Sequence, residues 1–549
     1  MHPFAASFLL SFPRRTLHEQ RIRHTNVGDS MVTSYKEDFS VTWEDPADGQ
    51  MPWIFDAMHT PAPLCPLAAE FWDRLMTAYM GMRTVYVNGY AFSSPATPRP
   101  PSPEILERGI FDVWTNDYLP KIKGSCERMR AGNYDSMSLA ELGDALEGVI
   151  AQAIDAFGYT MKAITGFMGP TFGFVEFLQN ALGSEGPQLA ATLLQGFENG
   201  TAAAGAGLSA LAEEAARRPA VAEALRQGRF DSLESLEGGP EFVAKFRTYL
   251  DEYGWRVDSW TYVERPTWAE HPRLPLTLIS HYISDPGRSP AAAHDRAVKQ
   301  RDDTLRDVEA RLSADKLPQF REMLQTCQVH VPVSEGRALW QLITVGSLRV
   351  PFLALGRKLV EAGTLSSADQ VFFFNTDELK QAAHSPSPQV KATAEKRQAD
   401  FARCAKLTPP PFVGAPPDMA QMPPEVLPLL TLFFGIAPPS IEGREIKGQA
   451  ASKGVVTATA RVIKDLSEAE RLQPGEILVC TTTAPPWTPL FAIAAAVVTD
   501  SGGVLSHSAI CAREYAIPCV VATQVATHLI RDGSTITVDG TRGIVQIEI

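Results

Sequence analysis

The chain has 549 residues, enough for two to four domains, and its 45% hydrophobic and 21% charged residues are typical of a soluble globular protein. Its net charge of −13 argues against a nucleic-acid partner, since such surfaces are usually basic. Seven scattered cysteines without a CxxC pair favour a reduced, cytoplasmic protein over a disulfide framework or a metal site, and no apolar run reaches the length of a membrane span.

The first four hundred residues predict an extension followed by a mostly helical domain. Residues 1–30 lack the pattern of a signal peptide, so we interpret them as an N-terminal extension. From about residue 36 to 125, prolines interrupt an aromatic-rich segment, which indicates extended chain lying across another part. Helical spacing or alanine-rich composition at 146–168, 202–228 and 294–365 predicts helices. Residues 31–405 are therefore expected to form one mostly helical domain.

The composition changes twice near the C-terminus. Residues 406–442 are dense in proline, which stiffens a linker, so we predict a hinge there. Beyond it, six short β-branched runs separated by Gly, Pro and Asp predict strands, with one helix starting near His507 and another over 489–494. Residues 443–549 are thus expected to be a small α/β domain, which makes the protein multidomain.

One stretch of this second domain, "SGGVLSHSAICAREYAIPCVV" at 501–521, indicates phosphate chemistry. Gly502 and Gly503 allow the backbone to approach a phosphate closely, and Ser506 is a candidate N-cap that places His507 in the first helical turn. Unpaired amides and the helix dipole favour an anion there, and a neutral imidazole can attack phosphorus. Arg513 could neutralise phosphate charge. Taken alone, however, a histidine near a helix start is more often a polar cap or a core residue.

The flanking segments decide between these readings. Together with "GQAASKGVVTATARVI", "PGEILVCTTTAPPWTPLF" and "DGSTITVDGTRGIVQI", the motif resembles the phosphohistidine swivelling domain of the PEP-utilising dikinase family, which includes phosphoenolpyruvate synthase, pyruvate phosphate dikinase and rifampicin phosphotransferase. Leu505 departs from the pattern, because many members carry threonine there. The resemblance implies that His507 accepts a phosphoryl group at one site and that the domain swings to deliver it at another.

Three upstream segments resemble, more weakly, the substrate-binding domain of rifampicin phosphotransferase: "FDAMHTPAPLCPL", "DEYGWRVDSWTYVERPTWAEHP" and "LGRKLVEAGTLSSADQVFFFNTDEL". Trp255 stands where relatives often carry histidine, which implies an altered acceptor pocket. We find neither the glycine-rich start of an ATP-grasp domain nor a TIM barrel. The resemblance therefore implies a separate ATP-grasp subunit that binds ATP and Mg²⁺, as in the similar phenylphosphate synthases and hydroxyphenyl-ketone phosphotransferases. No cofactor or metal is expected to be held firmly by this chain.

The density of aromatic residues in the first domain suits a flat phenolic acceptor, whose hydroxyl must lose a proton as it attacks phosphorus. His59, in the proline-broken entry segment, is our first candidate for the general base, and Arg256 could hold the incoming phosphoryl group. Each could equally be structural. Other substrate-site candidates are Trp255, Asp258 and His281, followed by Arg83, Arg349, Tyr86 and Tyr90. Cys511 and Cys519 flank the histidine helix and are expected only to pack there.

The sequence thus predicts the His-bearing subunit of a two-component phosphotransferase. The implied reaction converts ATP, acceptor and water to phospho-acceptor, AMP and phosphate, and the product would enter aromatic catabolism. One alternative is an antibiotic phosphotransferase acting on a rifamycin-type drug. Another is a non-catalytic, regulatory phosphohistidine carrier, although the large helical domain favours a real acceptor site.

Overall fold

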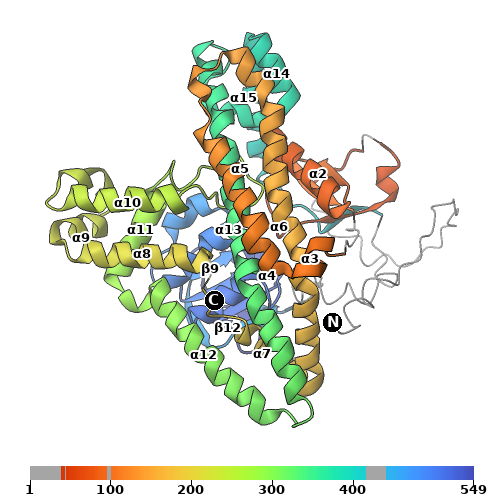
Figure 1. Ribbon diagram of the computed structural model, residues 1–549, viewed down its shortest axis with the longest axis vertical. Coiled ribbons are helices and arrows are strands. Elements are labelled where there is room, and N and C mark those ends of the chain that lie inside the picture. Colours follow the sequence, from red (N-terminus) through yellow and green to blue (C-terminus); the bar gives the residue numbers. More distant parts are fainter. Residues whose placement is uncertain (1–38, 44, 95–99, 199, 416–439, 549) are drawn as a thin grey trace.

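A computed structural model describes residues 39–43, 45–94, 100–198, 200–415 and 440–548. The protein is mostly helical and ends in an α/β domain built on a sheet, as predicted (Figure 1). The predicted N-terminal extension, residues 1–30, lies outside the described residues.

Two long helices, α6 (Leu139–Leu182) and α13 (Leu317–Glu361), pack along each other through the centre of the protein (Figure 1). A capping box between Ser138 and Glu141 starts α6, whose apolar face continues well beyond the predicted 146–168. The helical domain contains α2 (Pro66–Met80), α3 (Pro103–Arg108), α4 (Ile110–Val113), α5 (Leu119–Ala131), α7 (Gly186–Leu193), α8 (Gly200–Ala216), α9 (Pro219–Arg226), α10 (Gly239–Tyr253), α11 (Arg273–Ser284), α12 (Pro290–Arg311), α14 (Thr376–His384) and α15 (Pro388–Cys404).

Residues 36–125 are less extended than predicted. Pro66 and Pro103 lie in the first turns of α2 and α3, where the missing N–H would be unpaired in any case, so these prolines start helices instead of preventing them. The same region forms a small antiparallel sheet of order β2-β3-β1-β4. Its strands are β1 (Pro52–Phe55), β2 (Thr84–Val87), β3 (Tyr90–Ser93) and β4 (Phe412–Gly414).

Strand β4 belongs to the segment predicted as a linker, 406–442. It pairs with β1, and β5 (Ser440–Glu442), at the other end of the segment, joins the C-terminal sheet. Both ends of the predicted linker are therefore anchored in sheets. The residues between them, 416–439, lie outside the described residues, so a hinge there stays a prediction.

The C-terminal sheet has the order β5-β6-β13-β12-β8-β9-β10-β11-β7. Strands β8 to β11 run parallel, and the other pairs are antiparallel. All six predicted strands are present, whereas the helix predicted at 489–494 is a 3₁₀ helix, η11 (Pro485–Ala492), because its prolines lack the N–H of an α-helical bond. The remaining elements are β6 (Glu445–Lys447), β7 (Gln449–Ser452), β8 (Val455–Val462), β9 (Ile477–Cys480), β10 (Ala496–Thr499), β11 (Cys519–Val521), β12 (Thr535–Asp539), β13 (Ile544–Ile547), α17 (His507–Glu514) and α18 (Ala526–Leu529).

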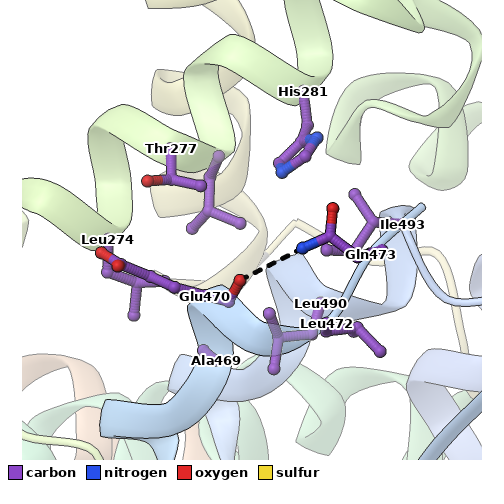
Figure 2. Close-up of a pocket in the computed structure, with 10 residues that line it drawn as sticks. Leu274, Thr277, His281, Ala469, Glu470, Leu472, Gln473, Leu490 and Ile493 are labelled. Atoms are coloured by element: carbon purple, nitrogen blue, oxygen red, sulfur yellow. Dashed lines mark hydrogen bonds between the residues drawn. The ribbon is translucent and has the colours of Figure 1, made fainter. Parts of the chain in front are cut away.

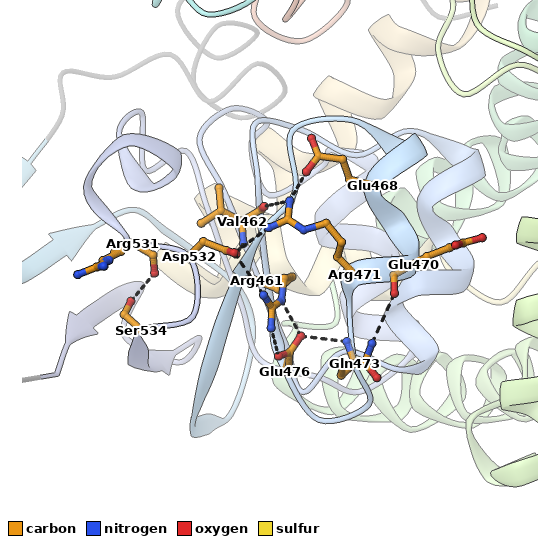
Figure 3. Close-up of polar contacts among 10 residues, drawn as sticks. All are labelled: Arg461, Val462, Glu468, Glu470, Arg471, Gln473, Glu476, Arg531, Asp532 and Ser534. Atoms are coloured by element: carbon orange, nitrogen blue, oxygen red, sulfur yellow. Dashed lines mark hydrogen bonds and ion pairs between the residues drawn. The ribbon is translucent and has the colours of Figure 1, made fainter.

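A network of ion pairs closes one end of this sheet (Figure 3). Arg461 on β8 donates to Glu476 and to Asp532, at 3.0 and 3.2 Å. Arg471 also donates to Asp532, at 2.7 Å, and the second Asp532 oxygen accepts the Val462 amide at 2.8 Å. Pairs near the surface contribute little individually, but together these contacts link β8 and the segment of Arg471 to the carboxylate of Asp532.

The C-terminal domain lies docked against the helical domain. Helices α8 to α11, which project to one side of the central column (Figure 1), share one hydrophobic core with α17, η11 and the near face of the sheet. A polar bridge adds to it: Arg265 pairs with Asp258 of its own domain at 2.8 Å and with Asp465 of the C-terminal domain at 2.6 Å. The histidine-bearing face is therefore turned toward the helical domain.

Among the described residues, one helix, α13, is long and apolar enough to cross a membrane by length and composition. Its most apolar 18-residue window is 83% buried inside the protein, as in the core helix of a globular domain.

Candidate phosphohistidine site

The loop that carries His507 follows β10, at the carboxyl end of the parallel strands, where α/β sheets usually place their ligands. Asp500 anchors its start, since this buried carboxylate accepts from the Thr527 amide and the Thr523 hydroxyl, both at 3.1 Å. Gly502 then has a φ of +92°, and a Cβ there would lie 2.9 Å from the Ser506 hydroxyl. Only glycine fits this turn without strain.

Helix α17 begins at His507, as predicted. Ser506 occupies the N-cap position, but its side chain makes no capping hydrogen bond, and the buried hydroxyl has no partner among the described residues. The first amides of α17 have no carbonyl partner within the helix. A phosphate at this end would therefore meet unpaired amides and an unpaired hydroxyl, so phosphate binding by Gly502, Gly503 and Ser506 remains a consistent prediction.

The imidazole of His507 is held within its own domain. Its Nε2 lies 3.0 Å from the hydroxyl of Thr488, on η11, and 3.3 Å from the thiol of Cys511, one turn along α17. The thiol and the hydroxyl are 3.6 Å apart. No role was predicted for Thr488, and Cys511 was expected only to pack, because neither residue type indicates a partner for histidine.

We expect the His507 imidazole to stay neutral well into the acidic range, because burial lowers its pKa to about 4 from an ordinary value of 6.5. The unfolded chain then binds more protons than the native one between about pH 6.5 and 4, so this residue reduces stability as pH falls through that window. NMR titration of the chain labelled on histidine would measure the midpoint, with His507→Gln to assign the signal. A midpoint near 6.5 would contradict the prediction.

Arg513 is buried behind the loop. Its Nη1 donates to the carbonyls of Val504 and Ala451, at 3.1 and 2.9 Å, while Nε and Nη2 have no partner among the described residues. Burial lowers the pKa of Arg513 to about 10, so it remains charged at neutral pH. The guanidinium thus supports the loop, and the predicted contact of Arg513 with phosphate would need its two unpaired nitrogens.

Two carboxylates that the sequence did not indicate lie at the domain boundary: Glu514, at the end of α17, and Glu335, on α13. Burial raises the pKa of Glu335, on α13. Burial, and then the nearby Glu335 carboxylate, raise the pKa of Glu514 to about 7. Glu335 also acts on the Cys511 thiol, whose pKa is raised well above normal chiefly by burial. Carboxyl groups with raised pKa values near a nucleophile are frequent features of active sites.

A cavity at this boundary has walls from α6, α13 and the segment around α7, and the histidine loop closes one side. Leu505 and Ile510 line it from the C-terminal domain, and Glu335 and His330 line it from α13. Burial lowers the pKa of His330, and its Nδ1 has no partner among the described residues. The apolar part of the wall includes Phe167, Met168, Phe172, Leu194 and Val331.

His59, the predicted base, is in a different arrangement. Its Nδ1 lies 2.8 Å from the Asp56 carboxylate, and its ring packs between Trp72 and Trp260. Burial opposes ionisation of Asp56, but His59 outweighs it and holds the pKa of that carboxyl below its usual range. The neighbouring Ala57 carbonyl accepts from the Ser501 hydroxyl at 3.4 Å, so this segment contacts the start of the histidine loop.

The structure places the other first-choice candidates in structural contacts. The Arg256 guanidinium is buried 3.6 Å from the centre of the Trp268 ring and donates to the Tyr249 hydroxyl at 3.1 Å. Asp258 pairs with Arg265 in the interdomain bridge. Trp255 is half-buried beneath Arg130. None of the three lines the cavity beside His507.

His281 lines a second cavity, between α11 and the C-terminal domain (Figure 2). Its neighbours there include Thr277 on its own helix and Glu470, Gln473 and Leu490 from the opposite side. Burial lowers the pKa of His281. The residue therefore faces a separate pocket from the one at Leu505 and Ile510.

The weaker candidates also make local contacts. Arg349 is buried and donates to Glu270 at 2.8 and 2.9 Å, and Arg83 pairs with Asp48 at 3.1 Å. The hydroxyls of Tyr86 and Tyr90 donate to backbone carbonyls. Within the described ranges, no group of three or more His, Cys, Asp or Glu residues is placed to hold a metal ion.

Comparison with known proteins agrees with this geometry. Residues 472–543 match the mobile domain of PEP-utilising enzymes, and residues 159–335 match the rifampicin phosphotransferase fourth domain. The chain is 30% identical to chondramide synthase cmdD of Chondromyces crocatus over 97% of its own length and 15% of that protein. It is 31% identical to the uncharacterized phosphotransferase YvkC of Bacillus subtilis, over 58% of this chain and 38% of that one. It is 28% identical to a rifampicin phosphotransferase of Streptomyces sviceus, over 70% and 44%. The chain thus spans less than half the length of each of these relatives, and the predicted family resemblance is confirmed.

Proposed function

Because the chain carries the mobile domain of PEP-utilising enzymes together with the fourth domain of rifampicin phosphotransferase, we propose that it is a phosphotransferase in which His507 carries the phosphoryl group. The observation that supports this most directly is the His507 imidazole at the start of α17, kept neutral by burial and beside amides that have no partner within the helix. Two neighbours of His507 along the chain, Leu505 and Ile510, line the cavity between the domains. ATP and Mg²⁺ would be bound by an ATP-grasp unit outside these residues, on a partner subunit. His507 would take the β,γ-pyrophosphoryl group, lose the γ-phosphate to water and pass on the β-phosphoryl group.

The acceptor in this proposal occupies the cavity lined by Leu505, Ile510 and the apolar side chains of α6 and α13. Its mostly apolar wall suits an aromatic compound with one hydroxyl turned toward His507. That hydroxyl must lose a proton to a base as it attacks phosphorus. Glu335 lines the same cavity and His59 is not among its lining residues, so we favour Glu335 as the base.

The main alternative acceptor is a large hydroxylated drug of the rifamycin type. The match to rifampicin phosphotransferase over 70% of the chain favours it. A small phenol would fill the cavity alone, whereas a larger compound would require the two domains to separate further.

The test follows the label from ATP to product. The chain is mixed with an ATP-grasp protein from the same organism, Mg²⁺ and ATP labelled at the β-phosphorus, and then with a phenol panel or with rifampicin. We expect acid-labile, base-stable label on His507, which then moves to one acceptor class as AMP and phosphate accumulate. Label that never reaches the chain with any ATP-grasp protein would refute the carrier role, and label passed to rifampicin but to no phenol would support the alternative acceptor.

A further inference from the structure

Two side chains of the same domain contact the ring of His507, so they move together with it. Thr488 comes from η11 and Cys511 from α17, and both lie in the C-terminal domain. The contacts at 3.0 and 3.3 Å are therefore kept wherever the domain docks. The other ring nitrogen, Nδ1, has within the described part of the chain only the longer contact of 3.8 Å to the Cys511 sulfur.

The hydrogens of this cluster can be assigned from its chemistry. Burial raises the pKa of the Cys511 thiol well above normal, so the sulfur keeps its proton, and burial keeps the imidazole neutral. The thiol can then donate to the Thr488 oxygen, 3.6 Å away, and the threonine hydroxyl is left to donate to Nε2. In this chain the thiol and the hydroxyl each donate once, and Nε2 is the acceptor. This arrangement leaves the ring proton on Nδ1.

We propose that Thr488 is a positioning residue for His507: its hydroxyl donates to Nε2, fixes the tautomer protonated on Nδ1, and reserves the Nε2 lone pair for phosphorus. This inference rests on the proposed phosphoryl transfer. In the step itself, the Nε2 lone pair forms the bond to the β-phosphorus, the bond to the bridging oxygen breaks, and that oxygen leaves with AMP carrying the electron pair. The Nδ1 proton stays in place, so nothing is oxidised or reduced.

The contact between the Thr488 hydroxyl and Nε2 also blocks access to the Nε2 lone pair. A hydroxyl donating from 3.0 Å lies along the lone pair, in the space that the phosphorus must enter. The hydroxyl or the ring must therefore turn aside before the N–P bond can form. Thr488 then holds the resting ring in one orientation and yields when the phosphoryl donor arrives.

The experiment compares Thr488→Val, which keeps the shape but removes the donor, with Thr488→Ser, which keeps the donor. Proton–nitrogen NMR of the full chain labelled on histidine reports the His507 tautomer at pH 7, without any partner or substrate. We expect the Nδ1–H form in the wild type, in Thr488→Ser and in Cys511→Ala, and a mixture of tautomers in Thr488→Val. In the labelling assay, the phosphorylation rate of His507 should fall about tenfold in Thr488→Val and stay within about twofold in Thr488→Ser, the change expected for one hydrogen bond.

Two results would overturn the inference. Thr488→Val could leave both the tautomer and the labelling rate unchanged, or Cys511→Ala could shift the tautomer while Thr488→Val does not, which would make the thiol the donor. If no variant, including the wild type, is ever labelled, the proposed function fails, yet the tautomer measurement still decides the role of Thr488.

Discussion

Replacing His507 with alanine should remove both the label on the chain and the formation of phospho-acceptor, a loss of at least about a thousandfold. The reason is that no neighbouring group can take over the attack on phosphorus. Burial keeps the Cys511 thiol protonated, and the Thr488 hydroxyl has no base in contact other than the imidazole that the substitution removes. Both half-reactions should fail, because the same nitrogen receives and delivers the phosphoryl group.

The matched control is His384→Ala. This exposed histidine lies at the end of α14 and pairs with Asp144 at 3.0 Å, so its loss should leave labelling within about twofold. Thermal unfolding of both variants separates loss of chemistry from loss of fold. Phospho-acceptor formed by a folded His507→Ala chain would move the carrier to another residue and refute the proposed mechanism.

Local sequence patterns were sufficient to predict much of the C-terminal domain. Short β-branched runs bounded by glycine and proline predicted all six strands, and three of these, β9, β10 and β11, are buried on both faces in the parallel part of the sheet. The glycine pair and Ser506 also located the start of α17. Such signals depend on backbone preferences within a few residues, which the sequence displays directly.

The structural effect of a proline depends on its position within an element, and local patterns do not show that position. Proline at 66 and 103 was interpreted as a breaker, but in a first helical turn it is favourable. Residues 406–442 were predicted as a hinge linker, and three of them, 412–414, form β4, which pairs with β1 in the N-terminal sheet. The pairing of β4 with β1 could not be predicted from local sequence, because the two strands lie far apart along the chain.

The candidate site shows the limit more clearly. Glu335 and Glu514 approach each other only because the two domains dock. The structural contacts of Arg256 and Asp258 likewise depend on tertiary packing, which brings their partners to them. A carboxylate in a helical run normally indicates a solvated face. Burial against a second domain, which raises its pKa, cannot be read from spacing.

Replacing Glu335 with glutamine should slow delivery to the acceptor about a hundredfold, within the range typical of losing a general base. The amide keeps the shape of the side chain but cannot take the hydroxyl proton. Loading of His507 should stay within about twofold, because that step requires no proton transfer at Glu335. Single-turnover mixing of pre-labelled chain with acceptor measures delivery alone.

The pH dependence gives a second readout. A base acts in its deprotonated form, and burial raises the pKa of Glu335, so delivery should weaken as pH falls through that raised value and recover above it. In Glu335→Gln this part of the profile should disappear.

Two controls decide between the candidate bases. Glu322→Gln lies on the exposed face of the same helix, α13, and should leave delivery unchanged. His59→Ala should cost less than about tenfold if the Asp56–His59 pair only shapes the entry segment, since that histidine is held by Asp56 and two tryptophan rings. A hundredfold loss in His59→Ala together with normal delivery by Glu335→Gln would return the role of base to His59. In that case the acceptor hydroxyl would lie toward Ser501 and Ala57, where that segment meets the histidine loop, and not in the cavity beside α13.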